Sequence, residues 1–207
     1  MIRIPQNAVR AVAYAMAVKD IRYYLNGMLV EHNGIETRLV CTDGYRLHAC
    51  IVNHKDGELL PAVVSFIVPD TMVKAMCKEK PAYRKQAVAF DIAVEGANLS
   101  ITMPDGTETH CKPIDGTFSD YRRAIPAEFS GECAQYNPSY TADAEAGAVA
   151  WGCRYPCFCH NGDSAGGIAL DGFVAVVMPR RADATLDAPD AAFRAAMAVA
   201  QPEEIAA

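Results

Sequence analysis

The residues with the clearest capacity for chemistry lie close together between positions 153 and 160. Three cysteines and one histidine occur there: Cys153, Cys157, Cys159 and His160. Thiolate sulfur and imidazole nitrogen are common ligands of zinc. Cys157 and Cys159, however, alternate as on one face of a strand, and the spacing matches no standard pair of zinc ligands. Buried or half-exposed thiols are therefore the favoured interpretation, and no metal is expected.

The rest of the chain offers no evident apparatus for catalysis. No serine or cysteine has a base partner in a recognisable motif, and no Gly-rich loop is typical of a phosphate-binding cradle. The sequence therefore predicts a protein that is not an enzyme and that needs no cofactor.

Composition favours a soluble, cytoplasmic protein of one or two domains. The chain has 207 residues, of which 51% are hydrophobic, enough to bury a substantial core. It has no apolar run of about 18 residues, and its N-terminus lacks the apolar core of a signal peptide. Most cysteines lie in apolar, strand-like runs, which favours reduced core thiols over disulfides; examples are Cys41, Cys50, Cys77 and Cys111. The net charge of -6 argues against a uniformly basic nucleic-acid binder, although one basic face remains compatible with it.

An internal repeat organises the elements that must position any site. A proline that could open a helix recurs at Pro5, Pro69 and Pro138, and an Asp-Gly turn signal recurs at 43–44, 105–106 and 171–172. Apolar residues at helical spacing follow the first proline, and strand-like runs at 87–94, 98–103 and 108–114 follow the second. We interpret these segments as three β-α-β-β-β units of an α+β fold. Two such units must pack together to close a core.

The first unit contains the most informative stretch, between Asp20 and Val52. Strand-like runs at 22–31 and 37–52 are joined by His32-Asn33-Gly34, which predicts a β-hairpin with a break at Asp43-Gly44. The sequences DIRYYLNGML at 20–29 and TDGYRL at 42–47 resemble the central domain of the bacterial DNA polymerase III beta subunit, the sliding clamp. VVMP at 176–179 is similar to the C-terminal end of that family.

The resemblance implies a domain organisation. Residues 1–126 look like one complete clamp domain, the middle one, and 127–181 like the last half of the C-terminal domain. The family's first domain and the first half of its third have no counterpart. Residues 182–207 form a tail outside the resemblance, in which a short helix after Pro189 could either fray in solvent or cover the third unit.

The resemblance also implies a pocket for short linear peptides carried by DNA polymerase, the clamp loader and repair factors. An apolar floor would bury peptide side chains while Arg, Asn and Tyr at the edge fix the peptide backbone. Ser119, Ala124 and Arg180 depart from the family pattern, which predicts a less filled floor and a more cationic edge. The matching positions are Leu25, Thr42, Gly44, Tyr45, Arg46, Leu47, Ser119, Arg123, Ala124, Asn137, Tyr140, Val176, Val177, Met178, Pro179, Arg180 and Arg181.

Contact with duplex DNA is the second implied site. Phosphate contacts of this kind are independent of base sequence and weaken with salt. The third predicted helix, 140–150, carries Asp143 and Glu145 and no Lys or Arg, so its face would repel phosphate. Lysine-rich helix ends are also commonly just solvated. The candidate residues are Arg10, Lys19, Arg22, Tyr23, Tyr24, Lys74 and Lys78, with Lys80, Arg84 and Lys85 after the second helix.

Three functions from different classes follow. The first is a reduced, clamp-like processivity factor of DNA replication, a homo-oligomer that forms a ring or part of one and tethers polymerase. The second is a peptide-binding module, encoded by a phage or mobile element, that encircles nothing and modulates or competes with the host clamp. An enzyme that reuses the fold is a distant third.

Overall fold

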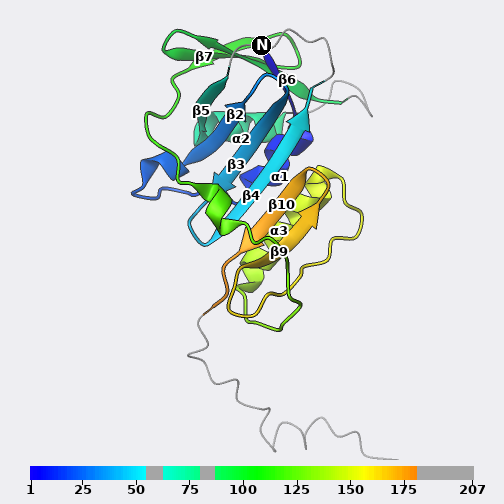
Figure 1. The fold of residues 1–207 in the computed structure, drawn as a ribbon. Helices are drawn as coiled ribbons and strands as arrows, with labels where there is room; N and C mark the ends of the chain where they lie inside the picture. The colour runs from blue at the N-terminus through cyan, green and yellow to red at the C-terminus, as the bar shows by residue number, and fades with distance from the viewer. Residues whose placement is uncertain (55–62, 80–86, 181–207) are drawn as a thin grey trace, which may run out of the picture.

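The computed structural model describes residues 1–54, 63–79 and 87–180, and these form three successive units (Figure 1). The predicted clamp-type α+β fold is confirmed in them. The first unit comprises β1 (Ile2–Pro5), α1 (Gln6–Ala13), β2 (Gly27–His32), β3 (Glu36–Thr42) and β4 (Arg46–Asn53). The second comprises β5 (Val64–Pro69), α2 (Asp70–Lys78), β6 (Ala89–Glu95), β7 (Asn98–Thr102) and β8 (Glu108–Cys111).

The first two units exchange their first strands. β1 pairs antiparallel with β6 of the second unit, and β5 pairs antiparallel with β2 of the first. Each helix begins directly after the proline that ends the exchanged strand, because the fixed φ of proline suits the first turn and its missing N–H costs no helical hydrogen bond. The two units are therefore joined through both of their sheets.

The third unit is smaller than predicted. It consists of α3 (Pro138–Trp151), β9 (Gly166–Leu170) and β10 (Phe173–Val177), and an isolated bridge between Cys159 and Gly167 stands where a further strand was expected. Its first strand does not form among the described residues. In the other units that strand pairs with the partner unit, and the third unit has no partner to supply such a ladder.

The third unit instead extends the sheet of the first. β10 pairs antiparallel with β4, which gives a six-stranded sheet of order β5-β2-β3-β4-β10-β9 beside a four-stranded sheet of order β1-β6-β7-β8. In Figure 1, β9 and β10 continue the plane of β3 and β4, and α1 and α3 cover the same face of that sheet. Gly147 lets α3 approach α1 closely, because a Cβ at this position would lie 2.8 Å from the Ala11 carbonyl oxygen.

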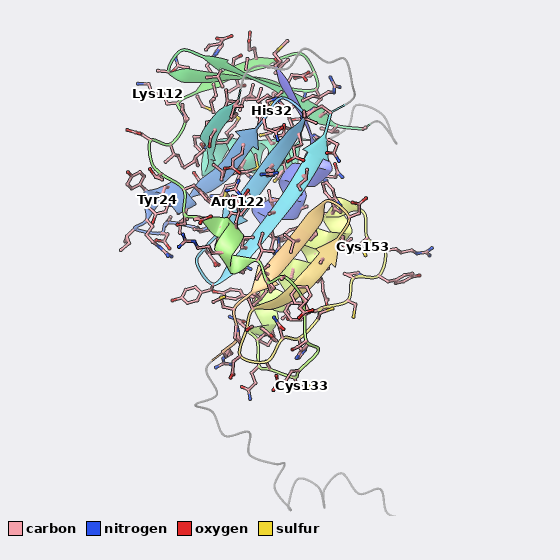
Figure 2. The ribbon with its side chains drawn as sticks, viewed as in Figure 1. Tyr24, His32, Lys112, Arg122, Cys133 and Cys153 are labelled. Carbon is pink, nitrogen blue, oxygen red and sulfur yellow. The ribbon has the colours of Figure 1, made fainter. Side chains whose placement is uncertain are left out.

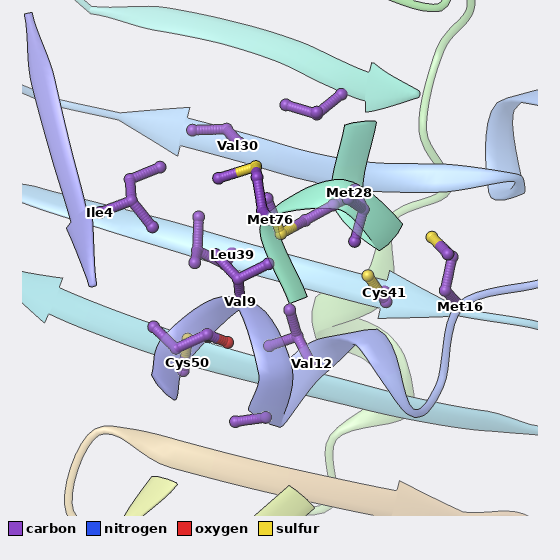
Figure 3. Packing of buried hydrophobic residues seen from close by; sticks show 14 of the residues in the cluster. Ile4, Val9, Val12, Met16, Met28, Val30, Leu39, Cys41, Cys50 and Met76 are labelled. Carbon is purple, nitrogen blue, oxygen red and sulfur yellow. Dashed lines mark hydrogen bonds between the residues drawn. The ribbon is translucent and has the colours of Figure 1, made fainter. Parts of the chain in front are cut away.

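One continuous core joins the three units. Ile4, Leu39, Met76 and Phe90 are fully buried between the helices and the two sheets, and Figure 3 shows the first three of these around α1 and α2. The same cluster includes Ala144 and Ala148 of α3 and Ile168 and Phe173 of the last two strands. The apolar face of the third unit is thus covered by the first unit.

The cysteines of the core behave as predicted from their apolar surroundings. Cys41 and Cys50 are buried, Cys77 and Cys111 are partly buried, and none is in a disulfide. Burial raises the pKa of the Cys50 thiol to about 12, which makes it a poor nucleophile near neutral pH.

Two local predictions need correction. The strand expected from Arg22 begins only at Gly27, because Tyr23–Leu25 form a 3-10 turn in which Asp20 and Asn26 side chains bond nearby backbone groups. The apolar residues at helical spacing after Pro5, which are Val9, Val12, Ala13 and Met16, predict a helix of about three turns, but α1 ends at Ala13. The predicted tail helix lies outside the described residues, and no helix within them is long and apolar enough to cross a membrane.

Candidate functional site

The turn between β3 and β4 meets the end of β10. Leu47 is in register with Val176 and Arg46 with Val177, and the Met178 N–H donates to the Tyr45 carbonyl at 2.8 Å. The third unit is therefore adjacent to the segment 42–47, as the family resemblance implies.

The sequence Thr42-Asp43-Gly44-Tyr45-Arg46 fixes this turn. Gly44 has φ +91°, a conformation that glycine adopts without a Cβ clash. Asp43 Oδ1 accepts hydrogen bonds from the backbone N–H groups of Tyr45 (2.9 Å) and Arg46 (3.0 Å), and Thr42 Oγ1 donates to the Arg46 carbonyl (2.6 Å). Such bonds from Asp and Thr side chains to nearby backbone groups stabilise the tight turn between the two strands.

A small pocket of about 100 Å³ lies at this junction. Leu47 and Val176 are almost fully buried and form its floor, whereas Tyr45 (64% exposed) and Met178 (48% exposed) stand at its rim. Exposed apolar side chains around a buried apolar floor are typical of a site that buries an apolar group of a partner. The lining residues are Thr42, Gly44, Tyr45, Arg46, Leu47, Ala124, Val176 and Met178.

Arg46 is held in place by both the first and the third unit. Its Nε lies 3.0 Å from the Asp43 carboxylate, another guanidinium nitrogen pairs with Asp143 on α3, and the guanidinium lies 4.5 Å from the centroid of the Tyr140 ring. Because these partners already surround it, Arg46 fastens α3 to the turn as well as lining the pocket. Local pattern marks Asp143 only as a charge on the third helix, because its proximity to Arg46 depends on the pairing of β10 with β4.

Several predicted pocket residues have other positions. Leu25 and Val177 are buried in the protein interior, and Asn137 caps α3, its side chain accepting from the Ser139 N–H at 3.0 Å. Ser119 lines a different depression, of about 850 Å³, under the segment 112–122. Arg123 is 87% exposed and pairs with Asp120 at 2.9 Å.

The C-terminal members of the predicted set leave the pocket. The Arg180 N–H donates to the Gln135 carbonyl at 2.7 Å, and neither Pro179 nor Arg180 lines the pocket; Arg181 lies outside the described residues. The structure thus brings together eight of the predicted residues, and their role in binding stays a prediction.

Three of the candidate DNA contacts line a groove between α1 and α2. Arg10 donates to the carbonyls of Cys77 (2.9 Å) and Glu79 (3.3 Å), and Lys74 pairs with Asp70 at 2.6 Å. Lys78 stands in the last turn of α2. Lys80, Arg84 and Lys85 fall outside the described residues.

The other candidate DNA contacts belong to the loop before β2. Arg22 pairs with Asp20 at 2.7 Å, and its hydrogen bonds lower the pKa of the Asp20 carboxyl to about 2. Arg22 also donates to the Asp43 carbonyl at 2.9 Å, so it supports the turn at the pocket. Tyr23 and Tyr24 pack edge to face; Tyr23 is exposed, whereas Tyr24 is partly buried against the cluster that includes Leu29 and Leu47. Lys19 precedes them with φ +56°.

The Cys and His residues at 153–160 do not converge. His160 accepts from the Ala134 N–H and packs against Tyr136, whereas Cys159 bridges to Gly167 through its backbone. Cys153 lies at the start of the same connection, directly after α3, where its N–H donates to the Ala148 carbonyl at 2.9 Å (Figure 2). Within the described ranges no three His, Cys, Asp or Glu side chains come close enough to hold a metal ion.

Comparison with known proteins accounts for this arrangement. Residues 4–120 match the family model of the DNA polymerase III beta subunit, central domain. The chain belongs to the DNA polymerase III beta subunit family. The beta sliding clamp of Proteus mirabilis is 36% identical over 118 residues, which cover 57% of this chain and 30% of that protein. That of Haemophilus influenzae is 36% identical over 132 residues, covering 59% and 33%. This family member therefore spans about a third of its relatives' length in those matches.

Solved clamps share the fold beyond the matched sequence. The DNA polymerase III beta subunit of Pseudomonas aeruginosa superposes with a TM-score of 0.67 at 22% identity, over 87% of this chain and 66% of that one. The subunit from Thermotoga maritima gives 0.66 at 17% identity, over 87% and 65%. The structural match thus covers more of this family member than the sequence match does.

Proposed function

We propose that this beta-subunit family member is a sliding-clamp-like processivity factor of DNA replication that binds linear peptides of DNA polymerase and the clamp loader. In this proposal residues 1–126 act as the complete domain and 127–181 as the half domain that completes the pocket. The observation that supports it best is the pocket itself, which combines the segment 42–47 and Ala124 with Val176 and Met178, and so exists only when the third unit is docked. No catalytic step is part of the proposal.

The pocket suits one apolar anchor of a peptide. Leu47 and Val176 are buried below it, while Tyr45 and Met178 at the rim can close over an inserted side chain. Burying a Leu- or Phe-sized side chain contributes about 1.5 to 3 kcal/mol before ordering costs are subtracted, which suits a contact in the micromolar range.

We expect Met178→Asp to weaken the binding of a labelled clamp-binding peptide at least about tenfold, because it places a charge at the apolar rim. Fluorescence anisotropy measures the affinity. Met178 is half exposed, so the substitution leaves the fold intact. The matched control is Ile35→Asp, an equally apolar-to-acidic change at a residue that is 72% exposed in the β2–β3 turn. Equal affinity in both variants would count against the pocket.

Contact with duplex DNA and assembly into a homo-oligomer complete the proposal. Arg10, Lys74 and Lys78 are candidate phosphate contacts on the helix face, and Lys19, Arg22, Tyr23 and Tyr24 on the loop before β2. Binding through them would be independent of base sequence and would weaken as salt rises from about 50 to 200 mM. A filter-binding titration at both salt concentrations, with light scattering for the oligomeric state, tests this part.

A second candidate is a peptide-binding module that encircles nothing and competes with the host clamp. The composition of α3 favours this candidate. The helix contains Asp143 and Glu145 but no Lys or Arg, so its charge repels phosphate. Monomers in light scattering together with no DNA retention at low salt would support this candidate over the processivity factor.

A further inference from the structure

A groove of about 540 Å³ is lined by residues of α1 and α2, by Met16 and Val18 after α1, and by Arg46. Ala13, Met16, Val73 and Cys77 supply apolar surface in it. Its two helices are fixed relative to each other, because the Gln6 side chain donates to the Met76 carbonyl at 2.7 Å and Arg10 donates to that of Cys77. The groove is therefore preformed.

Cations border this apolar floor. No ion pair joins Arg10 or Lys78 to a carboxylate within the described part of the chain, whereas Lys74 pairs with Asp70. Arg46 also lines the groove and is already paired with Asp43 and Asp143. An apolar groove with uncompensated positive charge at its edge fits an acidic segment that carries apolar side chains.

The described chain ends at Arg180, whose backbone N–H donates to the Gln135 carbonyl at 2.7 Å, two residues after a contact with the turn directly before Arg46. Met178 is hydrogen-bonded to the Tyr45 carbonyl, and the next residue after Tyr45 is Arg46, which lines the groove. Residues 181–207 follow from this point. Ten residues of extended chain span up to about 35 Å, so only part of this segment is needed to reach α1 and α2.

The segment 181–207 has the composition that the groove requires. It contains five carboxylates and two arginines, a formal charge of -3, and the apolar residues Leu186, Phe193 and Met197. We infer that residues 181–207 bind in the groove between α1 and α2, with their carboxylates at Lys74, Lys78 and Arg10. A tethered segment acts at a high effective concentration, so modest contacts suffice to keep it there.

Zero-length carbodiimide cross-linking of the full chain tests this inference, because the reagent joins a carboxylate to a lysine only when the two are in contact. After digestion, mass spectrometry of the monomer band should show links from Asp183, Asp187 or Asp190 to Lys74 or Lys78. Lys112, on the segment after β8, is the internal control and should show none (Figure 2). Links to Lys112 at equal yield, or no links to the groove lysines, would overturn the inference.

A charge reversal separates the groove from general attraction. In the double variant Lys74→Glu, Lys78→Glu, trypsin should cleave after Arg194 about tenfold faster than in the parent chain. The yield of links from the tail to the only other described lysines, Lys19 and Lys112, should not rise. Arg154→Glu is the control, since Arg154 is exposed on the third unit beside Tyr155. Cleavage at an unchanged rate in the double variant would contradict binding in the groove.

The consequence for DNA rests on the proposed function, although binding of the segment does not. Carboxylates at Lys74 and Lys78 would compete with phosphate, so the triple variant Asp183→Asn, Asp187→Asn, Asp190→Asn should bind duplex DNA about three- to tenfold more tightly at low salt. If the groove cross-links are present and neither chain binds DNA, binding of the segment in the groove is supported and the proposed DNA contact is contradicted. If both chains bind DNA equally and no cross-link forms, the groove inference fails alone.

Discussion

Gly147→Val should lower the free energy of unfolding by about 3 kcal/mol, because it pushes α3 away from α1. A Cβ at position 147 would lie 2.8 Å from the Ala11 carbonyl oxygen and 2.8 Å from His48 Nδ1. Neither atom can withdraw, since the first belongs to the backbone of α1 and the second to a fully buried ring. Urea-induced unfolding followed by circular dichroism measures the change.

We expect Gly147→Ala to lower the free energy of unfolding as well, against the usual effect of this substitution in a helix. Replacing Gly by Ala within a helix normally stabilises it by about 1 kcal/mol, so a net loss of stability would identify the close approach as its cause. Ala142→Val is the control for the cost of a β-branched side chain, since Ala142 is exposed on the same helix. If Gly147→Val costs no more than Ala142→Val, α1 and α3 are not packed as described.

The same variant links docking of the third unit to the candidate site. The pocket needs Val176 and Met178 from the third unit beside Leu47 from the first, and α3 supplies Asp143 to Arg46. We therefore expect Gly147→Val to weaken peptide binding as well as stability, although position 147 is not in the pocket.

Much of the fold could be predicted from local pattern. The three α-helices begin at or directly after the prolines that were expected to open them. The glycines of the three Asp-Gly pairs, Gly44, Gly106 and Gly172, all have positive φ. Such signals are local, because a proline restricts its own φ and a glycine permits its own turn. They locate elements without saying which strands pair.

The pairing of β4 with β10 could not be derived in that way. These strands lie more than a hundred positions apart, and only the family resemblance placed 176–179 beside 42–47. The same dependence explains the reduced third unit, since a first strand forms when a partner unit offers it a ladder. It also explains why Asp143, which anchors Arg46, was foreseen only as a charge that repels phosphate.

The buried histidine at the junction of the first and third units should make stability depend on pH. His48 is fully buried, its Nδ1 donates to the Ala11 carbonyl at 2.8 Å, and its Nε2 has no hydrogen-bond partner among the residues that the structure describes. Phe173 packs against the ring at 5.9 Å between centroids. Protonation would place a charge and an unpaired N–H in this apolar setting, which is unfavourable.

The direction of the effect follows from the shift in pKa. Burial, with a smaller contribution from the Arg46 charge, lowers the pKa of His48 from 6.5 to about 4, against the opposing effects of the Ala11 carbonyl and of Asp143 and Asp43. A group whose pKa is lower in the folded state binds its proton more readily when unfolded. Its contribution is therefore complete above pH 6.5 and is lost as the pH falls toward 4, by about 3 kcal/mol in total.

Unfolding by urea at pH 7.5 and at pH 4 measures this loss, and His48→Gln isolates it. The glutamine amide can still donate to the Ala11 carbonyl but takes up no proton, so the variant should lose about 3 kcal/mol less than the parent chain across that interval. His32, whose pKa burial also lowers, and the carboxylates titrate in both chains and cancel in the difference. Equal losses in the two chains would show that His48 is not confined as described. They would also contradict the docking of α3 that builds the pocket.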